Sequence, residues 1–383
     1  MTIPTIQHFA EYKTPFYYYD LELLDKTLRV AADEAARHGF HLHYALKANA
    51  NARLLAVIRE RGLGADCVSG NEVAAAIASG FRAGEIVYAG VGKSDEEIRL
   101  ALGENIGCFN CESFPELEVI NDIAGSLGKT ARVSLRVNPN VDAHTHHYIT
   151  TGIEENKFGF PLEQLERAAR ACLQLPRVEW RGIHFHVGSQ IADMRVFQQL
   201  CAKANAIQEE LLANGLAPTS VNFGGGLGID YENPDEQPVP AFADYFQTFA
   251  KHFARLPGQQ VHFEPGRAIA AQCGTLVARV LYVKEGTRKK FAILDAGMND
   301  LIRPALYQAR HRIENLTARP GDVEPYDVVG PVCESADCFG KDVLLPPTRR
   351  GDVIAIRSCG AYGEVMASRY NLRPLPGARF SND

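Results

Sequence analysis

Short β-rich segments alternate with amphipathic helical segments from about residue 16 to about residue 270. The β-rich segments include HLHYALK, EIVYAG and ARVSLRVN, and stretches such as SGNEVAAAIASG and FQQLCAKANAIQEELLANG between them have helical spacing. Several helical stretches begin at Ser, Asp or Asn and several end at Gly, as capped helices do. The alternation predicts βα units with parallel strands, arranged as an open sheet or an eight-stranded barrel.

Polar residues and glycines stand at the carboxyl ends of many of the β-rich segments. A barrel gathers its site from the tips of several strands, whereas an open sheet concentrates its site at one switch point. The sequence therefore favours a TIM-type (β/α)8 barrel, which we expect to span residues 25–268. The residues at the predicted strand ends are Lys47, Asp66, Asn138, 186–189, Gly224–Gly226 and Glu264–Arg267.

The pattern changes after about residue 270. GTLVARVLYVKEGTRKKFAILDAG, DVVGPVCE and GDVIAIRSCGAYG alternate apolar and polar residues between turns, with little helix among them. These runs predict a second domain, an antiparallel β-sandwich or β-barrel-like unit, at residues 269–383. We expect residues 1–24 to belong to this β domain as well.

Composition limits the functional classes. The chain has 383 residues and a formal net charge of −6, which argues against a nucleic-acid or membrane-surface partner. No basic start with an apolar run resembles a signal peptide, and no apolar stretch approaches the roughly 20 residues of a membrane helix. Nine scattered cysteines indicate reduced thiols in a cytoplasmic enzyme. Cys108 and Cys111 have C-x-x-C spacing, but without a second ligand pair two half-buried thiols are favoured.

Lys47 ends an apolar predicted strand in HYALKANAN. Lysine is seldom buried, so a lysine at a barrel mouth has two interpretations of about equal weight. One is a surface lysine that extends from the rim into water. The other is a lysine with a lowered pKa that attacks a carbonyl to form a Schiff base.

Two glycine-containing turns suit an anion. Gly224–Gly226 follow a predicted strand in NFGGGLG, where backbone N–H groups can approach a phosphate, although a tight structural turn is the alternative. FEPGRA places Gly266 and Arg267 after Glu264, which would otherwise form a local ion pair. Barrels often bind phosphate at their last strands, so two such turns there favour an anion site.

Histidines and cysteines elsewhere give weaker signals. His186, with Ser189 behind it in HFHVGSQ, is by itself more typical of a hydrogen-bonded core histidine than of a ligand. The HTHHY segment, with His144, His146 and His147, lacks the spacing of a metal site and is interpreted as a polar loop, so no metal is expected. The segment GPVCESADCFGKD is compatible with a metal cluster, a redox pair, two core thiols or catalytic groups of a site built elsewhere.

Six motifs in one order carry a resemblance that covers essentially the whole chain. YALKAN, HFHVGSQ, NFGGGLG, EPGR, CES and CGAYG together resemble the fold-type III pyridoxal-phosphate-dependent decarboxylases. THHYITTGIEENKFGF is similar to the branch of that family that converts meso-diaminopimelate to L-lysine and CO2 in lysine biosynthesis. The resemblance implies a carboxy-lyase with pyridoxal 5'-phosphate as its cofactor.

The resemblance also implies roles at the cofactor. Lys47 would hold pyridoxal phosphate as an aldimine, and loss of CO2 would give a quinonoid intermediate. His186 would stack on the pyridine ring, and Glu264 would face the ring nitrogen and keep it protonated. The residues implied at the phosphate and around the cofactor are Ser189, Gly224, Gly225, Gly226, Pro265, Gly266, Arg267 and Tyr362.

For the substrate, the resemblance implies a clamp at the end distant from the reacting carbon. Arg267 and Arg303 would bind the distal carboxylate, Glu334 the distal amine, and Tyr307 and Tyr362 would lie beside them. Cys333 would donate a proton after CO2 leaves, and it would come from the neighbouring subunit of a homodimer. Without the resemblance, Arg303 beside Pro304 would be taken as a surface residue.

Three alternatives remain at this stage. One is a related decarboxylase acting on ornithine, arginine or carboxynorspermidine, and another is a non-catalytic protein that only binds the cofactor. A metalloprotein built on HTHH and the cysteines is the weakest. Asp337 and Cys338 have no assigned role, although strand burial is favoured for Cys338 over oxidation with Cys333.

Overall fold

The computed structural model describes residues 9, 11–140 and 157–383 of the chain. They divide into two compact units. The barrel unit comprises Asp25–Gly228 and Pro240–Ile269, and the β unit comprises the chain up to Leu24, Ile229–Val239 and Ala270–Asp383. Segment 229–239, inside the span expected for the barrel, is thus grouped with the β unit. In the described part of the chain, no helix has the length and apolar composition needed to span a membrane.

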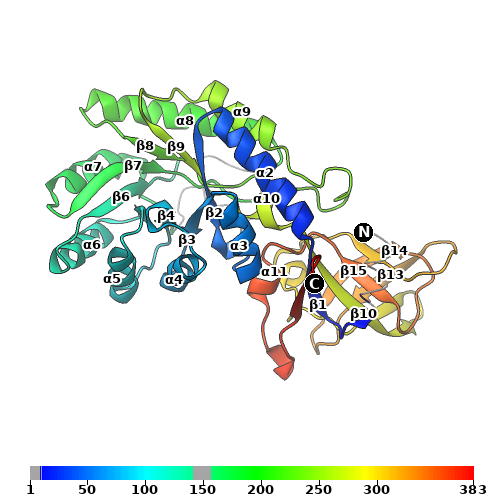
Figure 1. Cartoon of the computed structure of the whole chain (residues 1–383). Helices are drawn as coiled ribbons and strands as arrows, with labels where there is room; N and C mark the ends of the chain where they lie inside the picture. The colour runs from blue at the N-terminus through cyan, green and yellow to red at the C-terminus, as the bar shows by residue number, and fades with distance from the viewer. Residues whose placement is uncertain (1–8, 10, 141–156) are drawn as a thin grey trace. The chain divides into compact units, whose positions relative to one another are not determined.

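The barrel unit contains a closed parallel barrel in which β9 pairs with β2 and completes the ring (Figure 1). The prediction of a TIM-type barrel is therefore confirmed. Its strands are β2 (Phe40–Ala45), β3 (Gly64–Cys67), β4 (Ile86–Tyr88), β5 (Cys108–Cys111), β6 (Ala131–Arg136), β7 (Val178–His184), β8 (Ser220–Asn222) and β9 (Gln260–Phe263).

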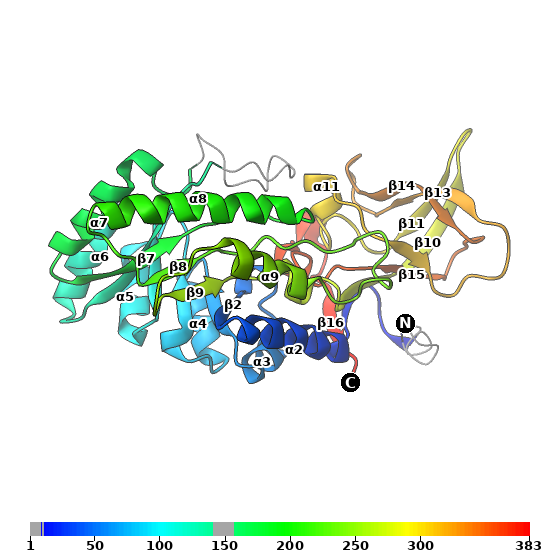
Figure 2. The ribbon, with the colours of Figure 1, turned by 90° about the horizontal axis from the view of Figure 1, so that it is seen from above.

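Helices surround the strands, and Figures 1 and 2 show α8 beside α9 on the outer side of β8 and β9. Ser side chains begin three of them: Ser69 Oγ, Ser94 Oγ and Ser113 Oγ each accept from a backbone N–H in the first turn. The helices are α2 (Leu21–Arg37), α3 (Ala52–Glu60), α4 (Gly70–Ala78), α5 (Asp95–Glu104), α6 (Phe114–Ser126), α7 (Leu165–Gln174), α8 (Met194–Ala213), α9 (Phe242–His252) and the short α10 (Arg267–Ala270).

An aromatic core fills the space between α8, α9 and the last two barrel strands. The Phe223 ring lies 4.7 Å from Phe249, and Phe249 lies 4.8 Å from Phe263, as measured between ring centroids. Tyr245 packs edge-on against Phe197 at 4.8 Å. Aromatic burial of this kind stabilises the side of the barrel that carries the Gly224–Gly226 turn.

The β unit contains a mostly antiparallel sheet, as predicted, in the order β12-β15-β10-β11-β13-β14, with β1 joined to β10. Two of its pairs, β1 with β16 and β11 with β13, are parallel instead. Its elements are β1 (Phe16–Tyr19), β10 (Gly274–Glu285), β11 (Lys290–Leu294), α11 (Arg303–Tyr307), β12 (Ile313–Asn315), β13 (Glu324–Val329), β14 (Cys338–Leu345), β15 (Val353–Ile356) and β16 (Gly377–Phe380).

Three histidines of the neighbouring strands β2 and β9 form a cluster. His43 Nδ1 lies 3.0 Å from the Glu85 carbonyl oxygen, and His43 Nε2 lies 3.0 Å from His262 Nδ1. The carbonyl can only accept, so His43 carries its proton on Nδ1 and accepts from His262 on Nε2. The His41 ring stacks on His262. Burial lowers the pKa of His43, and burial with the charges of His43 and His41 lowers the pKa of His262 well below its ordinary value.

Acid is expected to destabilise the protein through this cluster. A histidine whose folded pKa is depressed contributes stability above its unfolded pKa of roughly 6.5 and loses it as pH falls toward the folded value. Between pH 7 and 5 we expect the wild type to lose about 2 kcal/mol more than His262→Gln, whose amide does not titrate. Thermal unfolding across this pH range measures the difference. His252→Gln, outside the cluster, is the control, and equal slopes for all three proteins would contradict the prediction.

Candidate active site

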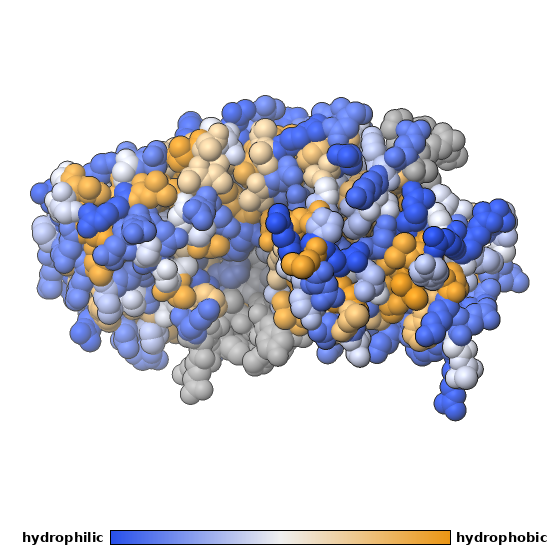
Figure 3. All heavy atoms as spheres, turned by 90° about the horizontal axis from the view of Figure 1, so that it is seen from below, coloured by the Kyte–Doolittle hydropathy of each residue, from blue (hydrophilic) through white to orange (hydrophobic). Residues whose placement is uncertain are grey.

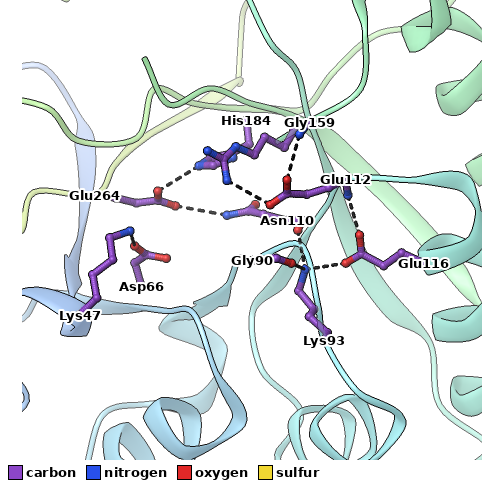
Figure 4. Close-up of polar contacts among 11 residues, drawn as sticks. Lys47, Asp66, Gly90, Lys93, Asn110, Glu112, Glu116, Gly159, His184 and Glu264 are labelled. Carbon is purple, nitrogen blue, oxygen red and sulfur yellow. Dashed lines mark hydrogen bonds and ion pairs between the residues drawn. The ribbon is translucent and has the colours of Figure 1, made fainter. Parts of the chain in front are cut away.

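Lys47 lies at the carboxyl end of β2, within the short helix η1 (Leu46–Ala48). Its side chain is 34% exposed, and Nζ lies 3.3 Å from Oδ2 of Asp66 at the end of β3 (Figure 4). Asp66 is fully buried, and within the described residues its Oδ1 has no hydrogen-bond partner. The two strand ends therefore form an amine–carboxyl pair that is open toward the barrel mouth on the lysine side.

Glu264 follows β9 and is buried among three donors from three other strand ends. Figure 4 shows two of them, His184 and Asn110. Oε2 lies 3.0 Å from His184 Nε2, and Oε1 accepts from Asn222 Nδ2 at 2.6 Å and from Asn110 Nδ2 at 3.2 Å. Three donors around one carboxylate favour its ionised form. The His184 Nδ1 atom has no hydrogen-bond partner in the described part of the chain.

The two carboxyl groups have opposite pKa shifts. Burial, together with the charge of Glu264, raises the pKa of Asp66 to about 8 against the opposing effect of Lys47. Burial also disfavours the Glu264 anion, but the charge and hydrogen bond of His184 and the charge of Lys47 outweigh it and hold the Glu264 pKa below its ordinary value. Near neutral pH the site therefore holds an ionised Glu264 and a protonated Asp66.

The predicted anion-binding turns lie on the same barrel face. Gly224 and Gly226 have φ values of +67° and +116°, which glycine adopts without strain. The Gly225 N–H points to His186 Nδ1 at 3.4 Å, and burial lowers the His186 pKa well below its ordinary value, so that the ring is neutral. The Arg267 guanidinium donates twice to Ser189 Oγ, at 3.1 Å from Nε and from Nη2.

Gly266 permits close contact between the last barrel strand and the lysine turn. A Cβ atom at Gly266 would lie 3.0 Å from the Ala45 side chain and 3.1 Å from the Ala48 side chain. The Ala45 N–H also donates to the Pro265 carbonyl at 3.2 Å. The segment that carries Glu264 and Arg267 is thus fixed against the segment that carries Lys47.

Buried ion pairs support the Glu264 environment from behind (Figure 4). Lys93 Nζ donates to Glu116 Oε1 at 2.5 Å and to the Gly90 and Asn110 carbonyls at 2.8 and 2.9 Å. Because Asn110 also donates its side-chain amide to Glu264, Lys93 fixes the end of β5 in the position that this donation needs. Beside it, the buried Glu112 pairs with Arg136 at 3.0 Å.

The other predicted residues lie in the β unit. Arg303 and Tyr307 are the first and last residues of α11, with Arg303 buried and Tyr307 half-buried. Cys333 and Glu334 are exposed in the loop between β13 and β14, and Glu334 accepts from the Tyr370 hydroxyl at 2.6 Å. Tyr362 has a φ of +57°.

Asp337 now has a structural role. Its carboxylate accepts from the Met298 N–H and the Val332 N–H, each at 2.6 Å, and it is 4% exposed. These bonds fold the loop that presents Cys333 and Glu334. Cys338, the first residue of β14, is half-buried, and both cysteines are free thiols.

Sequence reasoning missed three residues that hold Glu264: His184, Asn110 and Asn222. His184 is the last residue of β7 and stands two positions before His186 in the predicted strand HFHVGS, so the alternation of side chains could have indicated a shared face. Asn110 and Asn222 gave no comparable signal, because a polar side chain inside a predicted strand does not reveal its partner. Residues His144, His146 and His147, and most of THHYITTGIEENKFGF, lie outside the described residues.

Comparisons with known proteins identify the class first. The model of the family "Pyridoxal-dependent decarboxylase, pyridoxal binding domain" matches residues 23–271, which include the whole barrel. The chain is a pyridoxal-dependent decarboxylase, and pyridoxal 5'-phosphate is its cofactor. A diaminopimelate decarboxylase of Bacteroides thetaiotaomicron is 54% identical over 379 residues, 99% of this chain and 98% of that protein. The chain belongs to the diaminopimelate decarboxylase family.

Solved structures agree with this assignment. The crystal structure of diaminopimelate decarboxylase from Helicobacter pylori complexed with L-lysine has a TM-score of 0.92 and 42% identity, and the match covers 98% of this chain and 93% of that one. A lysine/ornithine decarboxylase from Vibrio vulnificus has a TM-score of 0.87 at 22% identity, covering 100% of this chain and 98% of that one. The second likeness concerns the fold alone.

The residues of the barrel unit fit the cofactor. Lys47 supplies a partly exposed amine, and Glu264 supplies a buried anion that the surrounding donors keep ionised. Asp66 Oδ1 is a buried oxygen without a partner among the described residues, and the glycine turn offers backbone close to the same face. The barrel unit therefore offers an amine for the cofactor aldehyde, a carboxylate for its ring nitrogen and a glycine turn for its phosphate.

Proposed function

We propose that the enzyme decarboxylates meso-diaminopimelate to L-lysine and CO2. The observation that carries this proposal is the 54% identity over nearly the full length of both chains to a diaminopimelate decarboxylase. The H. pylori relative was crystallised with L-lysine, the product expected here. Intact lysine, carboxylate and thiol groups at the motif positions favour an active enzyme over a non-catalytic cofactor-binding homologue.

Lys47 is the residue to which the cofactor is attached. Bound pyridoxal phosphate supplies an electron sink for the electron pair left when the C–CO2 bond breaks. Asp66 is protonated near neutral pH because its pKa is raised to about 8, and its Oδ2 atom lies 3.3 Å from Lys47 Nζ. The amine can thus exchange protons with a carboxyl group that water does not reach.

Glu264 would pair with the ring nitrogen of the bound cofactor and keep it protonated. Its support is the set of three donors that holds the carboxylate ionised and fixes its direction. The neutral, flat His186 ring would stack on the cofactor ring. The residues that would hold the cofactor phosphate and its surroundings are Ser189, Gly224, Gly225, Gly226, Pro265, Gly266, Arg267 and Tyr362.

The distal end of the substrate carries one carboxylate and one amine. Arg267 and Arg303 bind the carboxylate, Glu334 binds the amine, and Tyr307 and Tyr362 flank them. Support comes from Arg303, which is buried yet has no carboxylate within ion-pair distance in the described part of the chain. A buried cation without an anion is costly, which suits a residue that awaits a carboxylate ligand.

Cys333 protonates the reacting carbon after CO2 leaves. The carbon takes the proton from Sγ, the S–H bond breaks, and the resulting thiolate recovers a proton from water. We assign this thiol to the partner subunit of a homodimer. Exposed apolar residues near Glu334 and its partner Tyr370 support a dimer face there, because Leu372 is 95% exposed and Val365 and Leu375 are exposed as well.

The surface pattern is compatible with such a local contact face. On the side drawn in Figure 3, hydrophobic residues form several separate groups within a largely hydrophilic surface. Isolated apolar groups of this kind are ordinary, whereas a contiguous one marks a binding face. This view therefore marks no dimer face by itself. The exposure of Tyr370 and Leu372, with Tyr370 bonded to Glu334, is the reason to expect both residues in a mapped dimer interface.

Release of CO2 from meso-diaminopimelate, ornithine and arginine tests the proposal. We expect turnover of meso-diaminopimelate alone, because only that substrate has a distal carboxylate for the arginines. Faster turnover of ornithine or arginine would replace the proposed substrate. A cofactor-loaded protein without CO2 release from any of the three would favour the non-catalytic homologue.

A further inference from the structure

His311 precedes β12, and its ring lies between the Arg303 side chain and the backbone of Arg357, just after β15. Its Nδ1 atom is 2.8 Å from the Arg357 carbonyl oxygen, and its Nε2 atom is 2.9 Å from Arg303 Nη1. The carbonyl only accepts, so Nδ1 carries the proton, and the Nε2 lone pair accepts from the guanidinium. The two contacts thus define a neutral tautomer whose acceptor faces Arg303.

The surroundings of Arg303 leave most of its donors unused. The residue is 5% exposed, and its Cζ lies 4.9 Å from the centroid of the Tyr231 ring. One of the five N–H groups of an arginine goes to His311, and the described residues place no carboxylate within ion-pair distance of the other four. A nearby arginine differs: Arg357 contacts Asp235 at 2.7 Å and Glu314 at 3.1 Å.

The support behind His311 is rigid. The Arg357 N–H donates to the Arg312 carbonyl at 2.8 Å, and the two ion pairs of Arg357 hold its side chain. The Tyr231 ring meets the His311 ring edge-on at 5.0 Å and 80°. The imidazole therefore has fixed contacts on its ring and on both nitrogens.

We propose that His311 is a positioning residue for substrate selection. It holds Arg303 by one N–H group and so directs the remaining N–H groups toward the distal carboxylate of the substrate. This inference rests on the proposed function, since it takes Arg303 as a carboxylate ligand. A lysine could not replace Arg303 here, because an ammonium lacks the planar fork that divides between two acceptors.

Two substitutions of His311 test its two ring nitrogens separately. His311→Asn places an amide donor near the position of Nδ1 and leaves Arg303 without its acceptor. His311→Gln places an amide oxygen near the position of Nε2 and restores that acceptor. We expect His311→Asn to weaken L-lysine binding to the holoenzyme by about ten-fold or more, and His311→Gln to stay close to wild type.

Calorimetric binding of two ligands distinguishes a positioning role from a purely structural one, because a structural defect would weaken the binding of both ligands. L-lysine retains the distal carboxylate, whereas cadaverine has the same chain without it. We expect His311→Asn to leave cadaverine binding unchanged and to raise KM for meso-diaminopimelate with little change in kcat. Equal losses for both ligands, or no loss for L-lysine, would overturn the inference.

Arg303→Gln separates this inference from the proposed function. If Arg303→Gln binds L-lysine like the wild type, the role of Arg303 is wrong and the inference fails with it. If Arg303→Gln loses L-lysine while His311→Asn does not, only the inference fails. If His311→Asn does not fold, nitrogen-15 NMR of the wild-type protein provides the test, with the His311 signals assigned by their loss in His311→Gln. The inference requires that His311 carries its proton on Nδ1, and a proton on Nε2 would refute it.

Discussion

Replacing Lys47 with alanine is expected to abolish the absorbance of the attached cofactor and to reduce decarboxylation by more than about 10³-fold. Lys93 is not expected to take its place, because its amine is committed to Glu116 and two carbonyls. The protein should still fold. The lost cation leaves Asp66 buried, but its pKa is already raised to about 8, so it remains a neutral acid near pH 7.

Absorbance spectra of purified Lys47→Ala with added pyridoxal phosphate measure the effect. Lys47→Arg keeps the charge beside Asp66 but cannot attach the cofactor, and it should lose the absorbance equally. Lys203→Ala, an exposed position on α8, is the matched control. An attached-cofactor spectrum in Lys47→Ala would show that another amine holds the cofactor.

Cys333→Ala is expected to lower kcat by roughly 10²- to 10⁴-fold, the usual contribution of a positioned general acid, with cofactor attachment unchanged. Cys333 is exposed in a loop held by Asp337, so removing its sulfur should not disturb packing. Cys338→Ala, on the adjoining strand, is the control and should retain activity. Full activity in Cys333→Ala would refute the assigned proton donor.

Mixing two inactive variants tests whether the thiol comes from the partner subunit. A heterodimer of Lys47→Ala and Cys333→Ala would contain one site with both residues intact if sites are shared. Random exchange of subunits should then restore about a quarter of wild-type activity. A site completed within one chain would give no recovery, because every chain in the mixture carries a defect.

The sequence predicted the framework of the barrel site well for a physical reason. Parallel strands all end at one face of a barrel. Once the strand–helix alternation was recognised, Lys47, Asp66, Glu264 and the turn that begins at Gly224 were therefore expected at the same face. Their pairing was not predictable. That Asp66 faces Lys47 and that His184 faces Glu264 depends on side-chain direction and strand register, which the pattern does not contain.

The β unit was predicted with less detail. An antiparallel pattern does not reveal that β1 and β16, separated by most of the chain, pair in parallel. The role of Asp337 could not be predicted from the sequence, because its hydrogen-bond donors are the backbone N–H groups of Met298 and Val332, which leave no side-chain pattern. His311 was not considered for a similar reason, since the partner that fixes its tautomer is a backbone carbonyl.

The glycine turn has a consequence for interpreting mutational scans. A Cβ atom at Gly224 would lie 2.4 Å from the Phe185 carbonyl oxygen, and one at Gly225 would lie 2.4 Å from the Glu264 carbonyl oxygen. Alanine at either position would therefore push neighbouring strands apart before reaching any bound molecule. An inactive variant in this turn therefore reports on closure of the barrel, and a mutational scan would overstate how many glycines bind the cofactor. Cofactor analogues with an altered phosphate leave the protein backbone unchanged. They are better suited to measure how much the turn contributes to binding.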